Sequence, residues 1–311
     1  MQELHLWDLP HDRVYIRFKK EFQRNLFLEA KQLYGSWTKL AHFMDCNSRS
    51  LINWAYDRNF VPLSSALNIA SITNTKLEFL EENLSAIATG KKTKVNGKRG
   101  NPVFGIKFPI KLTSGLTRIL ARFMGDGCIK INWYYDSVYY NKEETLIEAM
   151  VQDVKSIFGE MKISESDDHG TKCVRFPSIV GLIIVTMFGE VGTFTAKLSE
   201  DILDASDNIK IAFLQAYFDD EGTVSLSQPM IRYYTANPQT CSSLSQLLSD
   251  IKIKSGKSKA RYLARHSREN TIYHVNVTGK DNVSKFLDIV SPLHPKKRKN
   301  IINLNSVAFG V

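Results

Sequence analysis

Two carboxylates occupy matching places at the ends of two helical stretches, and each precedes a glycine. Asp126 is the penultimate residue of GLTRILARFMGDG, and Glu221 is the penultimate residue of IKIAFLQAYFDDEG. A carboxylate in the last turn of a helix faces the negative end of the helix dipole, which costs roughly 0.3 kcal/mol or more. Stability alone would favour lysine or arginine there, so both acids are candidates for chemistry. We expect Gly127 and Gly222 to adopt the left-handed conformation in which helices commonly end.

Residues four positions apart on these stretches indicate how the two acids could meet. Ala121 and Gly125 lie on the first stretch, and Ala216 and Asp220 lie at the matching places of the second. Small residues at this spacing let two helices pack closely, and parallel packing would bring the two acids together. Two carboxylates that close repel unless a cation lies between them, and oxygen ligands suit Mg²⁺, with Mn²⁺ as a possible substitute. The pattern predicts metal-dependent attack of water on a phosphodiester.

The elements after each acid follow one order, which indicates an internal repeat with a period of 95 residues between Asp126 and Glu221. Two strand-like segments come next, then a helical segment, further strand-like sequence and an apolar helix. The first copy reads CIKINWYY, SVYYNK and ETLIEAMVQDVKSIFG, and the second reads TVSLSQ, MIRYYTAN and QTCSSLSQLLSDIKI. A repeat of this length predicts two facing or stacked half-domains.

The segments LARFMGDG and LQAYFDDEG resemble the paired motifs of LAGLIDADG homing endonucleases in their single-chain form, and the resemblance covers roughly residues 105–311. It implies an α+β fold with two pseudo-symmetric αββαββα half-domains that form a saddle on double-stranded DNA. It also implies that Asp126 and Glu221 are catalytic residues that bind the metal. The position of Asp220 is usually small in the family, so a carboxylate there is expected to loosen the helix contact or perturb metal binding.

The resemblance extends to two lysines. SPLHPKKRKN resembles the closing H-P-x-K segment of the family and offers Lys297, and GTFTAKLSEDI occupies the comparable place in the first half and offers Lys197. The resemblance implies that these catalytic lysines stabilise charge that develops on the phosphate during transfer.

Period-two alternation gives each predicted strand one polar face, which suits base edges in a major groove. The basic run KIKSGKSKARYLARHSR is expected to contact phosphates. An ordinary solvent-exposed face would show the same alternation. The predicted DNA-contacting residues are Lys130, Asn132 and Tyr134 in the first half, and Ser225, Arg232, Tyr234, Arg261, His274 and Asn276 in the second.

Residues 20–83 read as consecutive short helices that resemble a helix-turn-helix domain. Trp37 would open the first helix of that motif, and Asn47 would cap the second. A generic three-helix bundle is the alternative interpretation. The residues expected to face DNA are Arg49, Ser50, Asn53 and Arg58.

A basic stretch that starts at Thr89 has no acid and no helical periodicity over TGKKTKVNGKRGNPVFGIKFPIKLT. We interpret it as an extended linker that follows the DNA backbone or enters a minor groove, although a solvated tether would have the same composition. The linker residues expected to contact DNA are Lys91, Lys92, Lys94, Lys98 and Arg99. The predicted domains are a small all-α helix-turn-helix domain (1–84), the linker (85–114) and two half-domains (115–205 and 206–311).

Composition narrows the class of protein and of partner. The 41 basic and 32 acidic side chains leave a net charge of +9 over 311 residues, which favours a polyanionic partner such as nucleic acid. No apolar run is long enough for a membrane span, and the N-terminus lacks the order of a signal peptide. Four scattered cysteines (Cys46, Cys128, Cys173, Cys241) argue against zinc fingers and disulfides and favour a reducing interior, in the cytoplasm or nucleoid.

These features together predict a monomeric, site-specific endonuclease of double-stranded DNA with internal pseudo-two-fold symmetry and no membrane partner. Two alternatives stay open. One is a transcription regulator that keeps the LAGLIDADG scaffold without cleavage, which the added N-terminal domain and Asp220 favour and the two acids disfavour. The other is an RNA intron maturase on the same scaffold.

Overall fold

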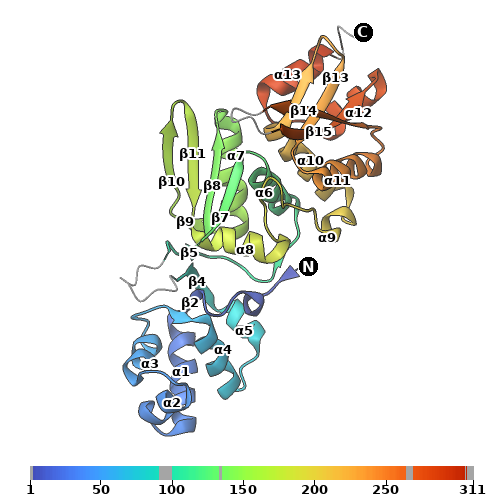
Figure 1. The fold of residues 1–311 in the computed structure, drawn as a ribbon. Coiled ribbons are helices and arrows are strands. Elements are labelled where there is room, and N and C mark those ends of the chain that lie inside the picture. The colour runs from blue at the N-terminus through green and yellow to red at the C-terminus, as the bar shows by residue number, and fades with distance from the viewer. Residues whose placement is uncertain (1–2, 91–99, 133–134, 264–268, 305, 307–311) are drawn as a thin grey trace.

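The computed structural model describes residues 3–90, 100–132, 135–263, 269–304 and 306. The N-terminal domain and the second half-domain lie at opposite ends of the molecule, with the first half-domain between them (Figure 1). Within the described residues, no helix is both long enough and apolar enough to cross a membrane.

The N-terminal domain contains the helices that the sequence predicts. Ser36 caps α2 by accepting a hydrogen bond from the backbone N–H of Lys39 at 3.2 Å, and Asn47 caps α3 through Arg49 at 2.8 Å. Asp45, in the turn between these helices, has a left-handed φ of 48°. The helices are α1 (Lys20–Tyr34), α2 (Trp37–Phe43), α3 (Ser48–Ala55), α4 (Leu63–Ile72) and α5 (Leu77–Glu82).

The N-terminal domain contains strands as well as helices, so the prediction of an all-α domain is wrong. The predicted linker is also wrong where its residues belong to a sheet. Strand β2 (Val14–Phe18) pairs with β3 (Val61–Pro62) and with β4 (Leu84–Thr89). This sheet continues through β5 (Val103–Phe104) to β9 (Glu160–Met161) of the first half-domain. Residues 85–89 and 103–104, which the sequence assigns to the linker, are therefore sheet residues. The reason is burial, because Ala86, Ile87 and Ala88 in β4 have almost no exposed surface.

A second pairing also ties the chain's beginning to the first half-domain. Strand β1 (Glu3–Leu4) pairs with β6 (Ile110–Lys111), and the short helix η1 (Leu6–Asp8) follows β1. The N-terminal domain is thus joined to the half-domains by strand pairing as well as by the chain itself.

The two half-domains have the same topology, which confirms the α+β fold class. Each begins with a central helix and an antiparallel hairpin, and each has a four-stranded antiparallel sheet. The sheet order is β7-β8-β11-β10 in the first half and β12-β13-β15-β14 in the second. The first half contains α6 (Ser114–Met124), β7 (Gly127–Ile131), β8 (Tyr135–Asn141), α7 (Glu144–Phe158), β10 (Ser164–Asp168), β11 (Thr171–Phe176), α8 (Ser178–Phe188) and α9 (Glu200–Leu203). The second half contains α10 (Asp207–Glu221), β12 (Gly222–Ser225), β13 (Met230–Thr235), α11 (Pro238–Asp250), β14 (Gly256–Leu263), β15 (Glu269–Thr278), α12 (Lys280–Ile289) and α13 (Pro295–Asn303).

The central helices α6 and α10 pack side by side and in parallel, as the sequence predicts. Near their beginnings, the Ser114 hydroxyl donates to the carbonyl of Asn208 at 3.3 Å. At their ends, a Cβ atom added to Gly125 would lie only 2.7 Å from that of Asp220. Ala121 and Ala216, between these two contacts, are completely buried. Small side chains on α6 therefore permit the close approach that brings both helix ends together.

Gly127 and Gly222 are required for space, so the prediction of left-handed glycines is wrong. Gly222 has an ordinary φ of −91°. A Cβ atom on it would lie 2.5 Å from the carbonyl oxygen of Phe218, and one on Gly127 would lie 2.7 Å from that of Arg122. Each glycine lets the chain turn from the helix directly into the first strand of its sheet.

Candidate active site at the paired helix ends

Asp126 and Glu221 meet where α6 and α10 end. Asp126 follows α6 by two residues, and Glu221 is the last residue of α10. Burial, and then the nearby charge of Asp126, raises the pKa of Glu221 to about 7. Burial also raises the pKa of Asp126, against the opposing charges of Lys297 and Arg122. The two carboxylates thus share one electrostatic environment in which full ionisation is unfavourable.

Asn141, at the end of β8, holds Asp126 in place. Its side-chain amide donates to Asp126 Oδ2 at 3.0 Å and to the Tyr139 hydroxyl at 3.1 Å. Its carbonyl oxygen accepts from the backbone N–H of Glu143 at 3.0 Å. Because Asn141 is buried and satisfied on both sides, it restricts the orientation of the Asp126 carboxylate.

A buried charge pair lies directly beneath the two acids. The Asp220 side chain has no exposed surface, and its Oδ1 accepts from the Tyr139 hydroxyl at 2.7 Å and lies 3.9 Å from Nη1 of Arg122. Arg122 is also fully buried, and its Nη1 donates to the Tyr139 hydroxyl at 3.1 Å. Burial raises the pKa of Asp220 to about 8 although Arg122 opposes this. The sequence led us to expect that Asp220 would loosen the helix contact. It does not, because Gly125 on the facing helix leaves room for its side chain.

Lys297 has a structural role that the sequence analysis did not predict. Its Nζ donates to the backbone carbonyls of Phe218, Asp219 and Asp220 at 3.1, 2.6 and 3.0 Å, so it caps the end of α10. Its three ammonium donors thus bind carbonyls, and its charge lowers the pKa of both Asp126 and Glu221. Lys197 is exposed on the segment between α8 and α9, and the described cations that act on the two acids are Lys297 and Arg122.

Asp219 adds a third carboxylate to the end of α10. Its Oδ1 accepts from the backbone N–H of His294 at 2.9 Å, while its Oδ2 is buried without a hydrogen-bond partner among the described atoms. Burial raises the pKa of Asp219 to about 6, and the positive charges of Arg122 and Lys297 oppose that rise. The helix end is therefore a buried cluster of acids that two internal cations only partly neutralise.

The pair of acids fits a hard divalent cation, which would relieve both the burial of charge and the repulsion by Asp126 that together raise the pKa of Glu221. In the described part of the chain, no group of three or more His, Cys, Asp or Glu side chains is arranged to hold a metal ion. Asp126 and Glu221 would thus supply two oxygen ligands, with substrate phosphate and water as the others. Such a mixed shell is common for Mg²⁺.

The second sheet presents a polar face opposite its buried face. Cross-strand pairing places Thr223 with Arg232, Arg232 with Asn276, and Tyr234 with His274. Arg232 Nε donates to Asn276 Oδ1 at 2.7 Å, which fixes both side chains. The predicted residues Ser225, Arg232, Tyr234, His274 and Asn276 therefore share one face.

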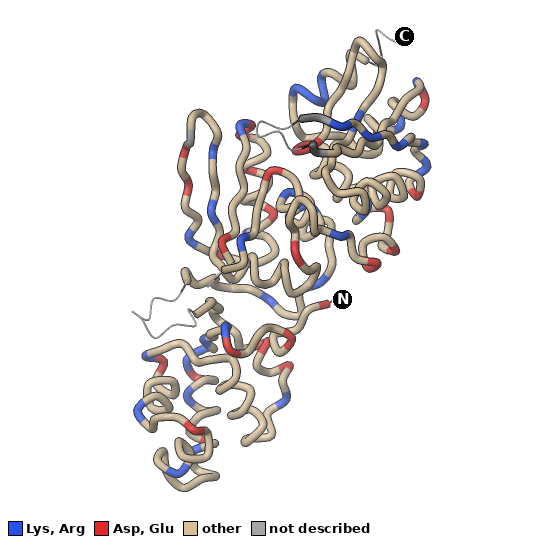
Figure 2. The backbone as a smooth tube through the Cα atoms, viewed as in Figure 1, with Lys and Arg blue, Asp and Glu red and all other residues tan. Residues whose placement is uncertain are grey.

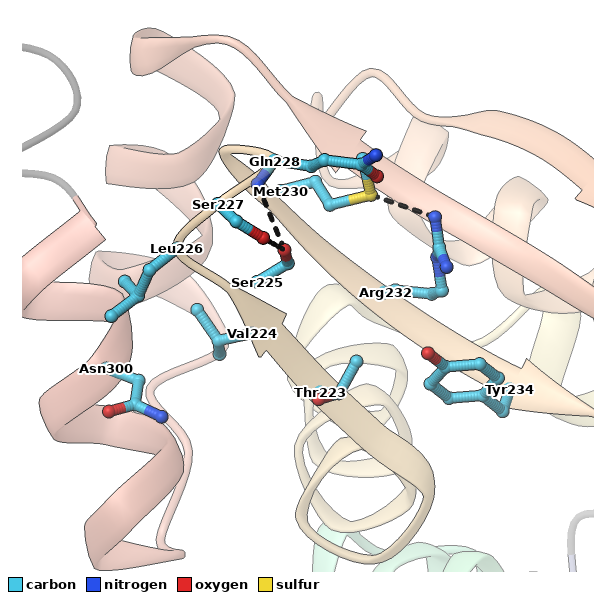
Figure 3. Close-up of a pocket in the computed structure, with 10 residues that line it drawn as sticks. All are labelled: Thr223, Val224, Ser225, Leu226, Ser227, Gln228, Met230, Arg232, Tyr234 and Asn300. Carbon is cyan, nitrogen blue, oxygen red and sulfur yellow. Dashed lines mark hydrogen bonds between the residues drawn. The ribbon is translucent and has the colours of Figure 1, made fainter.

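Part of this face is hollowed. A cleft of about 520 Å³ runs over the β12–β13 hairpin, and Asn300 of α13 closes one side of it (Figure 3). Ser225, Arg232 and Tyr234 line this cleft together (Figure 3). The concave, hydrogen-bonding surface suits the edge of a polar, extended ligand.

Comparison with known proteins bears on this arrangement of paired helices and sheets. Residues 208–291, which include α10 and most of the second half-domain, match the family model described as LAGLIDADG-like domain. The chain carries a LAGLIDADG-like domain. No curated protein sequence matches the chain.

The chain also resembles several solved structures, at low sequence identity. I-DmoI in complex with DNA and Ca is 18% identical, with 61% of this chain and 98% of that chain covered and a TM-score of 0.44. I-DmoI with DNA and Mn is 19% identical, with 57% and 97% covered and a TM-score of 0.42. Full-length DUF199/WhiA from Thermatoga maritima is 11% identical, with 61% and 60% covered and a TM-score of 0.41.

Arg261 does not share the polar face of the LAGLIDADG-like domain. It pairs with Thr271, whereas the strand positions on the polar face are those of Ser258 and its alternate neighbours. Lys257 and Lys259 share the face of Arg261 along the edge strand β14. Arg261 is exposed on this edge strand, and its predicted contact with phosphates, as part of the basic run, stays a prediction.

The first sheet has a smaller polar face. Lys130 is exposed on β7 and pairs with Asp136, and Asn132 is exposed just beyond that strand. Tyr134 lies outside the described residues. The sequence interpretation missed Arg175, which shares this face and pairs with Asp136 in an ion pair, and Tyr140, which is exposed nearby. Alternation in SVYYNK and KCVRF could have identified both.

The predicted contacts of the N-terminal domain are only partly accessible. Arg49 and Arg58 are exposed, while Ser50 and Asn53 are half-buried on α3. The linker residues predicted to contact DNA all fall within 91–99 and lie outside the described residues.

Charge is distributed unevenly between the half-domains. Residues 115–205 carry nine basic and fourteen acidic side chains, whereas residues 206–311 carry fifteen basic and eight acidic ones. Figure 2 shows lysine and arginine positions along β14 and around α13 of the second half. A polyanion is therefore attracted mainly to the second half-domain.

Proposed function

We propose that this protein is a site-specific endonuclease that hydrolyses both strands of a DNA duplex with Mg²⁺. The observation that carries the proposal is the convergence of Asp126 and Glu221 at the end of two parallel helices, between two sheets with polar faces. Two carboxylates that repel one another at adjoining helix ends reduce stability, so a functional reason is needed to keep them.

Both sheets would bind the duplex, each at a separate place. Each polar face would enter a major groove, where donors and acceptors on base edges distinguish all four base pairs. The acids, which lie between the sheets, would then face the minor groove that separates the two major grooves. Asn141 holds Asp126 towards this place, and Lys297 keeps the end of α10 from fraying. A bound Mg²⁺ supplies activation of water and charge neutralisation at the phosphate.

The second half-domain would make the tighter contact. Its polar face is preorganised, because Asn276 accepts from Arg232 and donates to the Ser258 hydroxyl at 3.0 Å. The excess of basic side chains in the second half-domain would fix its position on the DNA phosphate backbone. The first half-domain would contribute fewer contacts to DNA. We further propose that the protein acts as a monomer in the reducing interior of the cell.

The decisive experiment is incubation of the full-length protein with a randomised duplex library and Mg²⁺, with sequencing of both the cut and the retained DNA. Asp126→Asn and Glu221→Gln should bind the same sites yet lose cleavage by orders of magnitude, because each deletes a metal-binding charge at almost constant shape. Asp207→Asn is the matched control, since this acid is exposed in the first turn of α10, at its opposite end. Cleavage that survives both active-site changes would refute the proposal.

A DNA-binding regulator without cleavage is the second candidate. The buried Asp220 and the acidic excess of the first half-domain favour it, because both are unusual in a surface that must hold two strands for hydrolysis. If the wild type selects a specific site but does not cut it with Mg²⁺ or Mn²⁺, this function replaces the first.

A further inference from the structure

Phe194 has the most exposed large apolar side chain of the described residues, with 73% of its surface accessible. It lies at the tip of a turn that joins α8 to α9, between Thr193 and Thr195. Isolated apolar residues at the surface are common, but this one is held at a specific place by the other half-domain.

The turn is anchored on both sides. Asn237, which is buried at the beginning of α11 in the second half, donates to the carbonyls of Phe194 and Ala196 at 3.3 and 2.7 Å. Val191 and Ala196 are themselves buried, so the chain is fixed just before and just after the tip. The turn therefore presents the Phe194 ring from a defined backbone position.

The turn also borders the acids. Thr193 and Ala196 line a small cavity of about 40 Å³ together with Glu221 and Met124. Phe194, the neighbour of Thr193, is thus exposed close to the place where the minor groove would lie in the proposed complex.

The second half-domain has a comparable segment on the other side of the acids. His294 donates its backbone N–H to Asp219, and its ring lies 3.9 Å from Glu143 at the beginning of α7 in the first half. Glu143 and Asn237 are the N-cap residues of α7 and α11, so each segment approaches the residue that begins the corresponding helix of the other half. Leu293 is the apolar residue exposed there, at 36%.

Proteins that bind the minor groove insert phenylalanine or leucine between base pairs, which unstacks a step and kinks the duplex. We propose that Phe194 is such a wedge: it enters the minor groove at the centre of the target site, unstacks one base step and bends the DNA towards both sheets. Leu293 supports the other side of the same step. This inference rests on the proposed binding of duplex DNA and does not depend on cleavage.

The proposed wedge predicts a preference for certain DNA sequences that does not depend on hydrogen bonds to the bases. Pyrimidine–purine steps unstack most easily, so selected sites should be enriched in TA or CA at their centre. Selection with Phe194→Ala should lose this central preference and keep the preferences on either side, which the sheets determine.

The test uses the full-length protein and a selected duplex, with 2-aminopurine placed at successive central positions and a donor and acceptor dye at the two ends. Wild-type protein should raise the 2-aminopurine fluorescence at one step and shorten the end-to-end distance. Phe194→Ala should abolish both changes and weaken binding roughly 5- to 150-fold, whereas Phe194→Leu should keep part of each. Phe79→Ala is the control, since Phe79 is half-exposed on α5 of the N-terminal domain.

Each outcome has one meaning. Unchanged fluorescence and bending in Phe194→Ala would overturn the wedge while duplex binding stands. Absence of any duplex binding by the wild type would overturn the proposed function itself. A change in oligomeric state of Phe194→Ala, with normal bending, would show that Phe194 contacts protein and would also overturn the wedge.

Discussion

Replacement of Glu221 by glutamine should stabilise the metal-free protein while it removes the proposed activity. A carboxyl group whose pKa is higher in the folded protein than in the unfolded chain stabilises the fold fully at low pH, and this contribution is lost as pH rises through the folded pKa. The pKa of Glu221 rises from an ordinary 4.5 to about 7, mainly through burial. At pH 8 the charged side chain therefore opposes folding, and glutamine does not.

The magnitude follows from that difference in pKa. At 1.36 kcal/mol for each tenfold change in proton affinity, a rise from 4.5 to about 7 gives an upper bound of ~3.4 kcal/mol. Glu221 is only half-buried, so water screens part of the interaction, and we expect roughly 1–2 kcal/mol. This corresponds to an increase in Tm of about 2–8 °C for the half-domains.

The assay is thermal unfolding of wild type and Glu221→Gln with a chelator at pH 8 and at pH 4.5. The variant should be more stable at pH 8, and most of its advantage should be lost at pH 4.5, where Glu221 is protonated in the folded wild type. Saturating Mg²⁺ at pH 8 should raise the Tm of the wild type but not that of the variant, because only a ligand that binds the folded state stabilises it. Asp207→Asn should show neither effect. Equal or lower stability of Glu221→Gln at pH 8 without metal would refute the electrostatic reasoning.

Three further predictions concern neighbouring groups. At pH 9, where Asp220 is ionised beside Arg122, Arg122→Met should lower the free energy of unfolding by roughly 3–5 kcal/mol in urea titrations, because it leaves Asp220 buried without its cation, and Arg122→Met combined with Asp220→Leu should recover most of the loss; additive losses would contradict the pairing. Lys297→Met should raise the pH at which Mg²⁺ begins to stabilise the protein, because Lys297 lowers the pKa of Glu221, and an unchanged pH dependence would show that this charge does not act on the site. Lys259→Gln should make the log–log dependence of duplex affinity on salt shallower by about 0.9, because Lys259 is exposed on the basic edge strand β14 that is expected to contact phosphates, whereas Lys155→Gln, on α7, should leave it unchanged; equal slopes for both variants would remove β14 from the phosphate contacts.

The sequence by itself determined the features that depend on local pattern. Two helices with small residues at matching places, each ending in an acid and followed by a strand, are sufficient to predict two half-domains and a parallel pair of helices. Alternation within single strands is sufficient to place Arg232, His274 and Asn276 on one face. These predictions succeed because the helical and strand periods act over a few neighbouring residues.

Tertiary structure decided how the buried charges are neutralised and which strands pair. Asp220 depends on Arg122 from the other half. Lys297 of α13 caps the end of α10, although the nearest carbonyl that it binds, that of Asp220, is 77 residues away in sequence. The strand β4, which overlaps the start of the predicted linker, is a strand only because β2 and β5 lie on either side of it. Burial sets the charge states of these acids, and pairing between distant strands sets the edges of the sheets. Neither can be predicted from helical or strand periodicity, because both depend on residues far apart in the sequence.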